Sequence, residues 1–275
     1  MISSRAFSQL LSAALLLQSA ACAMNVSEAR PARILRGGEW QISEANNIVV
    51  PTGVIAEAVD KGETVVKLID EGRPATDEEK ALLVGSAVSM ALQSPGYGAH
   101  LDLAVGLGYG ADLQLRIGNG IYAASMRYGL HSGPWHMTVG ARAAYNSGES
   151  FIPYIEKLSR YAKIAGMQRF DGQLFAQFGI EAGEWMRLWV GPKLLYSRYG
   201  AEIDAAELGL GKESFAGDLL SYGGFIGAAG GFRVFFVVVE LTLLRVEPET
   251  LTLFGNPHTL GGWVVAPTWG FQVVF

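Results

Sequence analysis

The last stretch of the chain, residues 263–275, alternates strictly between two kinds of side chain. One face carries Trp263, Trp269, Phe271 and Phe275, with aromatic rings at both ends, whereas the other face is small or polar. A period of two is what a β-strand needs when its two faces meet different environments. The pattern therefore predicts a strand whose outside touches lipid and whose inside lines a tight, partly polar interior.

The very end of this strand also carries a short motif. Phe275 closes the chain, and Val273 and Phe271 precede it at steps of two residues. This ending resembles the C-terminal assembly signal of bacterial outer-membrane β-barrels. The resemblance implies insertion by the barrel-assembly machinery, contact with outer-membrane lipid and lipopolysaccharide, and no cofactor. It places the chain in the cell outer membrane of a Gram-negative-type bacterium.

Composition favours membrane-crossing strands over membrane-crossing helices. Glycine accounts for 35 of 275 residues, charged residues for 17%, and the mean hydropathy is +0.24. After the N-terminus no window approaches the roughly 18 uninterrupted apolar residues of a membrane helix. The nearest, Val234 to Leu244, is rich in β-branched residues and broken by Glu240. A net charge of −5 gives no reason to expect a nucleic-acid partner.

The N-terminus has the features of an export signal over residues 1–21. Arg5 is followed by an apolar run from Leu10 to Leu17 and then by small residues. The sequence Ser19-Ala20-Ala21-Cys22 resembles a bacterial lipoprotein signal, in which Cys22 would be acylated, although Ser replaces the usual Leu. Ordinary cleavage after Ala21 or Ala23 is the alternative. Residues 22–36 are polar and mildly basic, which is typical of a tether.

The barrel domain is predicted over residues 37–275, with an insert at about 52–96. In this insert Thr76-Asp77-Glu78-Glu79 forms a capping box that opens an apolar run, which predicts a helix. Residues 84–92 also alternate, so the first strand is either 37–51 or lies within 82–93.

From Gly98 onward, alternating segments are separated by turn signals such as Asn119-Gly120. Counted from Gly37 there are ten strands, an even number, as in single-chain bacterial barrels. A helical segment is expected between the fifth and sixth strands. With the C-terminus in the periplasm, the outer connections are 52–96, 118–120, 146–169, 200–216 and 246–262. The inner connections are 109–111, 130–134, 183–184 and 230–232.

Four of these five outer connections are long and every inner one is short, which is the asymmetry known for outer-membrane barrels. The sequence therefore predicts an all-β fold, an antiparallel transmembrane β-barrel of about ten strands with a helical extracellular insert. A soluble barrel like that of the lipocalins is the alternative fold.

Charged residues recur on the inward face of the predicted strands. They are Asp102, Asp112, Arg116, Arg127, Arg142, Glu181, Arg187, Lys193 and Glu240. Because an isolated buried charge costs several kcal/mol, charges in a narrow interior must pair. The pattern favours an ion-paired plug, and a selectivity lining for a small pore is the alternative reading.

Other residues that could carry chemistry give weaker signals. His100 and Asp102 share a face, and His136 could join them as an acid–base pair or a metal site, but a histidine bonded to an aspartate as interior filler is the simpler reading. No Gly-x-Ser-x-Gly elbow occurs. Lys157, Arg160 and Lys163 could meet lipopolysaccharide phosphates or form a solvated helix face.

These observations predict a non-enzymatic outer-membrane barrel with a structural or surface-interaction role and a largely plugged interior, with no cofactor and no metal. Its outer loops would meet a partner that the sequence does not name. A narrow porin-like channel for small solutes is the alternative, and an outer-membrane hydrolase is a distant third.

Overall fold

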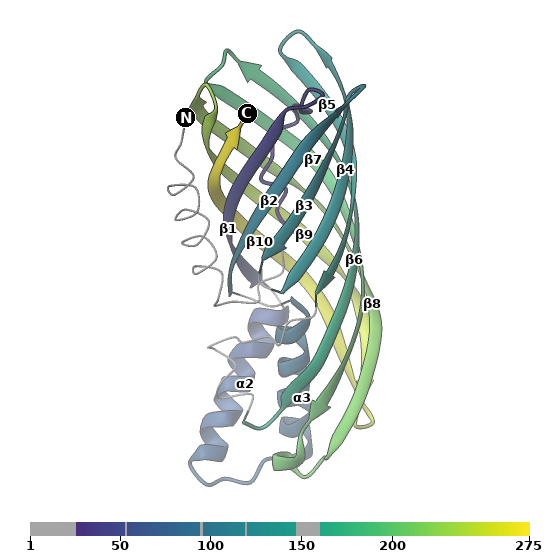
Figure 1. The fold of residues 1–275 in the computed structure, drawn as a ribbon. Coiled ribbons are helices and arrows are strands. Elements are labelled where there is room, and N and C mark those ends of the chain that lie inside the picture. The colour runs from purple at the N-terminus through teal and green to yellow at the C-terminus, as the bar shows by residue number, and fades with distance from the viewer. Residues whose placement is uncertain (1–25, 53, 94–95, 119, 147–159) are drawn as a thin grey trace, which may run out of the picture.

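The chain forms a closed ring of ten antiparallel strands (Figure 1). The computed structural model describes residues 26–52, 54–93, 96–118, 120–146 and 160–275. Strand β1 pairs with β10 on one side and with β2 on the other, so the ring closes in the order β1-β10-β9-β8-β7-β6-β5-β4-β3-β2. The predicted ten-stranded antiparallel sheet is confirmed.

The first strand lies in the earlier of its two candidate positions, and residues 82–93 are helical. The strands are β1 (Trp40–Thr52), β2 (Gly96–Gly108), β3 (Ala111–Gly118), β4 (Ile121–Ser132), β5 (Trp135–Asn146), β6 (Lys163–Ala182), β7 (Met186–Asp204), β8 (Lys212–Phe232), β9 (Phe235–Leu253) and β10 (Asn256–Val274). The helices are α2 (Val54–Asp70), α3 (Asp77–Gln93) and the short 3-10 helix η2 (Ala206–Leu208).

The alternation in sequence becomes an apolar outside and a polar inside. In the last strand Trp263, Phe271 and the adjoining Phe275 lie on the outer face with 44%, 42% and 58% of their surface exposed. By contrast, Arg127 and Glu240 are only 2% and 4% exposed, on the inner face. Successive side chains of a strand point to opposite faces, so the period-two pattern alone sorts them in this way.

Aromatic side chains mark both rims of the outer apolar surface. Exposed rings near the rim with the short turns are Trp40, Tyr109, Trp135, Trp185, Phe232, Phe235 and Phe275. Exposed rings toward the other end are Tyr97, Tyr122, Phe170, Tyr196, Tyr222 and Trp263. The surface between them is mostly aliphatic, with a few further rings such as Trp269 and Phe178.

The connections differ between the two ends, but less than predicted. At one end the connections 109–110, 133–134, 183–185 and 233–234 are all short turns, as expected. At the other end, 146–169, 200–216 and 246–262 were predicted as loops, and this is wrong in part. Strand β6 already begins at Lys163, 205–211 is a compact connection, and 254–255 is a tight turn. The helix expected between β5 and β6 falls mainly on 147–159, outside the described residues.

The physical reason for this difference is that β6–β10 continue well past the ring. These strands have 19 to 21 residues, whereas β1–β5 have 8 to 13. Their extensions form a curved surface beyond the ring, and helices α2 and α3 lie against it (Figure 1). The added strand length is therefore stabilised by packing that no local sequence signal reveals.

The extension has its own apolar core. Helix α3 contributes Leu83, Val84, Val88 and Leu92. Strands β7, β9 and β10 contribute Leu195, Tyr199, Leu244, Leu251, Leu253 and Leu260. The α3 helix approaches β10 closely at Gly85, where a Cβ atom would lie 2.6 Å from Nδ1 of His258. Among the described residues, no helix is long and apolar enough to cross a membrane.

The predicted capping box of α3 is present. The Thr76 N–H donates to Oε2 of Glu79 at 2.9 Å, and the Glu79 N–H donates to Oγ1 of Thr76 at 3.3 Å. The bond from the Thr76 N–H, followed by the one from Arg73, lowers the pKa of Glu79. Because this pKa is lowered on folding, the cap contributes at neutral pH and weakens as the pH falls through the folded-state pKa.

Replacing the capping hydroxyl should loosen the start of α3. We expect Thr76→Ala to cost about 1 kcal/mol of local stability and to speed amide hydrogen exchange at Asp77–Glu79 about fivefold. Thr64→Ala is the matched control, because the Thr64 hydroxyl bonds to the Asp60 carbonyl inside α2. Equal exchange in the two variants would contradict the capping role.

Candidate functional site: the occupied interior of the barrel

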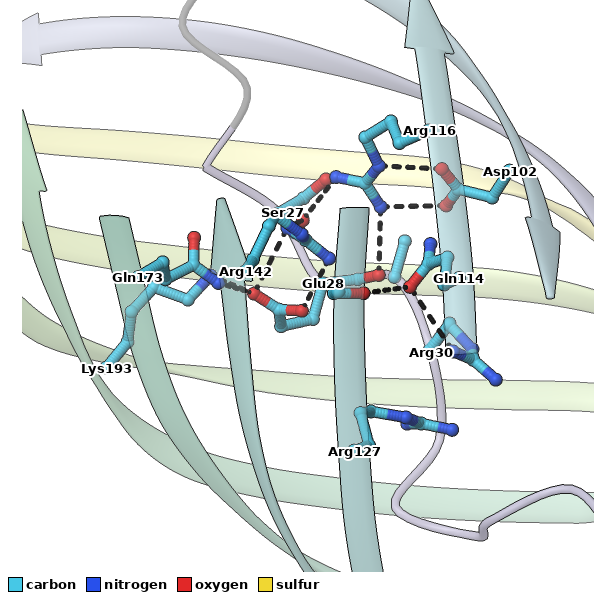
Figure 2. Close-up of polar contacts among 12 residues, drawn as sticks. Ser27, Glu28, Arg30, Asp102, Gln114, Arg116, Arg127, Arg142, Gln173 and Lys193 are labelled. Carbon is cyan, nitrogen blue, oxygen red and sulfur yellow. Dashed lines mark hydrogen bonds and ion pairs between the residues drawn. The ribbon is translucent and has the colours of Figure 1, made fainter. Parts of the chain in front are cut away.

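The interior of the barrel is occupied by the chain's own N-terminal segment, residues 26–36 (Figure 2). Val26, Glu28 and Arg30 are 0%, 2% and 1% exposed. The sequence analysis assigned these residues to a tether, and the structure places them inside the ring. The segment starts at Val26, in the apolar cluster that also contains Leu83 and Val88 of α3. It ends at the rim with the short turns, where Trp40 N–H donates to the Phe275 carbonyl.

Glu28 is the acid around which two cations and one amide, from three strands, converge. Its Oε2 lies 2.8 Å from Nη2 of Arg142 on β5, and its Oε1 lies 2.9 Å from Nζ of Lys193 on β7. Gln173 on β6 donates its side-chain amide to the same carboxylate. Figure 2 shows these groups around one carboxyl. Glu28 thereby gives Arg142 and Lys193, each of which is almost fully buried, a shared carboxylate partner.

Glu240 on β9 binds the backbone of the segment at Glu28 and Ala29. Its two carboxylate oxygens accept the N–H groups of Glu28 and Ala29 at 2.7 and 2.9 Å. Ala29 has a φ of 47°, and successive N–H groups at such a bend form a concavity that suits an anion. Trp189 and Thr242 donate to the same carboxylate at 3.1 and 3.2 Å. These bonds hold a backbone conformation that alanine rarely adopts.

Asp112 on β3 forms the second acidic centre. Its carboxylate accepts hydrogen bonds from Arg127 at 3.0 and 2.8 Å, and from Arg30 of the segment at 3.1 Å. It also accepts the Leu35 N–H at 3.2 Å. We call the ring of strands around the segment the barrel wall. One carboxylate of this wall therefore binds a guanidinium of the wall, a guanidinium of the segment and a backbone amide of the segment.

Arg116 links a third wall carboxylate, Asp102, to the segment. Its Nε and Nη2 each donate to Asp102 at 2.7 Å, in the bidentate geometry that makes such pairs strong. The rest of its guanidinium reaches the carbonyls of Ser27 at 2.8 Å and Glu28 at 3.3 Å. Asp102 thus orients Arg116 toward the segment.

The backbone carbonyls of the segment are satisfied by the wall. Residues 26–39 contain no helix or strand, so their buried carbonyls need other partners. Eight consecutive carbonyls find one in a side chain of β3, β4, β5, β6, β7 or β10. The donors are Lys193 for Val26, Arg116 and Arg142 for Ser27, Arg116 for Glu28, Gln272 for Ala29, Gln177 for Arg30, Arg127 for Pro31, Thr138 for Ala32 and Arg127 for Arg33.

Three wall glycines make room for the half of the segment nearest the short-turn rim. A Cβ at Gly179 would lie 2.7 Å from Cβ of Ala32, and one at Gly129 would lie 2.6 Å from Cγ1 of Ile34. A Cβ at Gly106 would lie 1.8 Å from the Arg36 carbonyl oxygen. The glycines on β2, β4 and β6 therefore form a groove shaped to this segment.

Seven of the nine charged residues selected from the sequence lie in this interior. They are Asp102, Asp112, Arg116, Arg127, Arg142, Lys193 and Glu240. The other two, Glu181 and Arg187, pair with each other at 2.9 Å near the short-turn rim, where their side chains are 25% and 11% exposed. Cys22 lies outside the described residues.

The histidines proposed as an acid–base pair or metal site are not brought together. His100 lies 3.7 Å from Asp102, is 1% exposed, and faces an aspartate whose two oxygens are bonded to Arg116. His136 lies toward the short-turn rim, 3.5 Å from Glu181. In the part of the chain that the structure describes, no three His, Cys, Asp or Glu side chains form a metal-binding group.

Sequence reasoning missed the two central charges of the segment, Glu28 and Arg30. A signal exists for Glu28 only, because the barrel wall alone buries more cations than carboxylates, whereas Arg30 adds a further cation, so that the two together leave that excess unchanged. The buried groups of the wall are four cations (Arg116, Arg127, Arg142 and Lys193) and three carboxylates (Asp102, Asp112 and Glu240), apart from the separate Arg169–Asp171 pair. Two of the cations, Arg142 and Lys193, depend on an acid from elsewhere.

Little empty space is left around Glu28 and its partners. A cavity of about 10 Å³ lies beside Arg116, Arg142 and Gln173, which is about the space of one water molecule. At the short-turn rim a hollow of about 400 Å³ is bordered by Arg33, His131 and Glu181.

Comparison with known proteins yields weak structural likenesses. No protein-family model matches the sequence, and no curated protein matches it. The chain is similar to Neisserial surface protein A (9% identity, 86% of this chain and 95% of that chain, TM-score 0.34). It is also similar to Ail, the attachment invasion locus protein of Yersinia pestis (13%, 87% and 99%, TM-score 0.30). A third is outer membrane protein AlkL (11%, 92% and 97%, TM-score 0.28). Likeness at this level transfers no function.

Removing the central acid should destabilise the whole barrel. Glu28→Ala leaves Arg142 and Lys193 buried without their carboxylate, so we expect a loss of about 3–5 kcal/mol in the free energy of unfolding. Urea unfolding of the purified protein, followed by tryptophan fluorescence, measures this loss. Glu184→Ala, in an exposed turn, should change stability by less than about 0.5 kcal/mol. Similar midpoints for the two variants would contradict the central role of Glu28.

Proposed function

We propose that this chain is an outer-membrane β-barrel protein of a Gram-negative-type bacterium, closed by its own N-terminal segment, with a structural or surface-interaction role. The observation that carries the proposal is a closed ring with an apolar outside and a charged inside. On β9 alone Val237, Val239, Leu241 and Leu243 follow one another on the outer face, each 44–54% exposed. A soluble protein would expose such a surface to water at great cost, whereas lipid accepts it.

The ring also meets the backbone requirement of a bilayer. Lipid offers no hydrogen-bond partner, so a sheet crosses it only when every strand edge is paired. Closure between β1 and β10 supplies that pairing. Aromatic rings at both rims suit the two lipid–water interfaces.

The short turns and the C-terminus are proposed to face the periplasm, and α2, α3 and the long strand extensions to face outside. In this orientation Arg198 and Arg245 stand on the outer surface at the level of the outer aromatic rim or just beyond it. We propose that they meet lipopolysaccharide phosphates. Arg160, selected for this role from the sequence, lies 3.6 Å from Asp70 of α2.

The remaining features of biogenesis belong to the same proposal. Residues 1–21 act as the export signal, and Cys22 is the acylation site. Phe271, Val273 and Phe275 present the assembly signal to the barrel-assembly machinery, and their places on the outer face of the last strand and at its end support such contact.

The interior supports a plugged barrel over an open channel. The segment 26–36 fills the ring, and its ion pairs link strands on opposite sides. A porin-like channel would require this segment to leave. A non-enzymatic role is also proposed. His100, the candidate residue for hydrolysis, is buried beside Asp102, and both carboxylate oxygens of Asp102 already accept hydrogen bonds from Arg116.

Placing a charge on the lipid face should block membrane insertion. Leu241 lies on the outer face near the middle of β9 and is 46% exposed. Leu241→Arg should cost about 2–4 kcal/mol if this face meets lipid. We expect less protein in the outer-membrane fraction and less of the heat-modifiable band on SDS gels. Glu207→Arg, on the exposed η2 connection, should insert normally. Recovery of the wild-type chain in the soluble periplasmic fraction without detergent would contradict membrane placement.

The plugged interior should not conduct. We expect the refolded wild-type protein to show no discrete ion-selective steps in planar lipid bilayers, because the segment occupies the ring. An ordinary porin recorded in the same bilayers provides the positive control. Regular steps from the wild-type protein that disappear in Arg116→Ala or Glu240→Ala would favour the narrow channel instead.

A further inference from the structure

We propose that the barrel interior is a sequence-selective binding site for an extended peptide. Residues 26–36 fill this site in cis, and a free peptide of the same chemistry can replace them without unfolding the wall. The inference rests on the contacts between wall and segment and not on the membrane placement proposed above.

The first argument is the way in which the wall binds the peptide backbone. A chain segment packed as part of a core usually satisfies its carbonyls through a helix or a sheet. Here eight consecutive carbonyls are bound by side chains of six different strands, and Glu240 takes two N–H groups. Such side-chain donors recognise an extended backbone in the way that a peptide-binding protein does.

The second argument is that two side chains of the segment enter charged pockets. A cationic pocket on β5–β7, formed by Arg142, Lys193 and Gln173, binds the Glu28 side chain. An acidic pocket on β3, formed by Asp112 and Gln114, binds the Arg30 side chain at 3.1 and 3.2 Å.

The residue between these two charges determines the shape of the ligand. In an ordinary extended chain, residues two apart point to the same side. The positive φ of Ala29 bends the backbone instead, and Glu28 and Arg30 reach different parts of the wall. The preferred ligand is therefore an acid and an arginine separated by one small residue that tolerates positive φ. Glycine meets this requirement best.

The third argument is the groove between these pockets and the short-turn rim. Gly179, Gly129 and Gly106 leave space that Ala32, Ile34 and the Arg36 backbone fill. Bulk at any of these wall positions would collide with the segment. The groove fixes the register of the ligand, so the charged pockets always meet the same two residues.

The fourth argument is the charge of the empty wall. Without the segment, Arg142 and Lys193 lose their carboxylate, and Glu240 loses two N–H donors. A vacated site of this kind attracts a peptide that restores these contacts, because buried unpaired charges are costly.

The experiment uses the full chain and releases the segment after folding. A protease recognition sequence is inserted between Gly37 and Gly38, which are exposed at the rim. After cleavage the protein is incubated with a fluorescent synthetic peptide of residues 26–36, in urea below the unfolding midpoint. Heat-modifiable migration on SDS gels verifies that the barrel stays folded, independently of peptide binding. Bound label and the released native segment are measured after gel filtration and by mass spectrometry.

We expect saturable exchange with the native-sequence peptide in the cleaved protein and none in the uncleaved protein. Peptides with Glu28→Ala or Arg30→Ala should bind at least about 30-fold more weakly, because each leaves buried charges unpaired. The Ala29→Gly peptide should bind at least as tightly as the native sequence. These changes are made in the peptide, so the folding of the barrel is not affected.

Two results would overturn the inference. One is failure of any label to enter a cleaved barrel that remains folded, which would show that the segment is a permanent part of the core. The other is equal binding of the native peptide and a scrambled peptide of the same composition, which would show nonspecific adsorption. Neither result bears on membrane placement, which the fractionation of Leu241→Arg tests separately.

Discussion

The pairing of buried charge is the interaction on which the rest of this structure depends. Arg142 and Lys193 of the barrel wall lie where no wall acid reaches them in hydrogen-bond geometry among the described contacts. A buried charge without a partner costs several kcal/mol. Glu28 supplies the missing carboxylate from a segment that is distant in sequence. The ring of strands and the N-terminal segment therefore form one electrostatic unit, and the buried charges of the wall are all paired only when a segment of this chemistry lies inside it.

The dependence also runs in the other direction. The segment has no secondary structure of its own, so inside the ring its carbonyls rely on wall side chains such as Arg127 and Gln272. Neither part satisfies its polar groups alone. This mutual requirement explains how a polar interior can be filled, and why the proposed role lies on the outer faces of the barrel. It also makes the interior a recognition site, because the same contacts that close the barrel distinguish one peptide from another.

Most of the wall could be predicted from the sequence, because a strand with two different faces needs a period of two and the turns carry their own signals. The strand ends were harder to predict. Pro248 and Pro257 indicated loops, since proline cannot donate to a β-ladder, yet both lie inside long strands. The β8–β9 pairing ends at Val246, and the β1–β10 pairing ends at Trp263, so each proline lies where one side of its strand is unpaired. Packing against α2 and α3 then extends strands that local signals would end.

The sequence by itself determined the alternation of faces, the ten strands, the capped helix α3 and the wall charges, because each depends on neighbours a few residues apart. Only the tertiary structure decided what fills the ring. Glu28 meets Glu240 across 212 residues of sequence, and no local pattern states which strands will surround a given backbone carbonyl. Residues 26–36 read as a tether because their hydrogen-bond partners are distributed over the whole chain. Closure of the ring brings these partners together around the segment, and a peptide without secondary structure thereby becomes the core of the barrel.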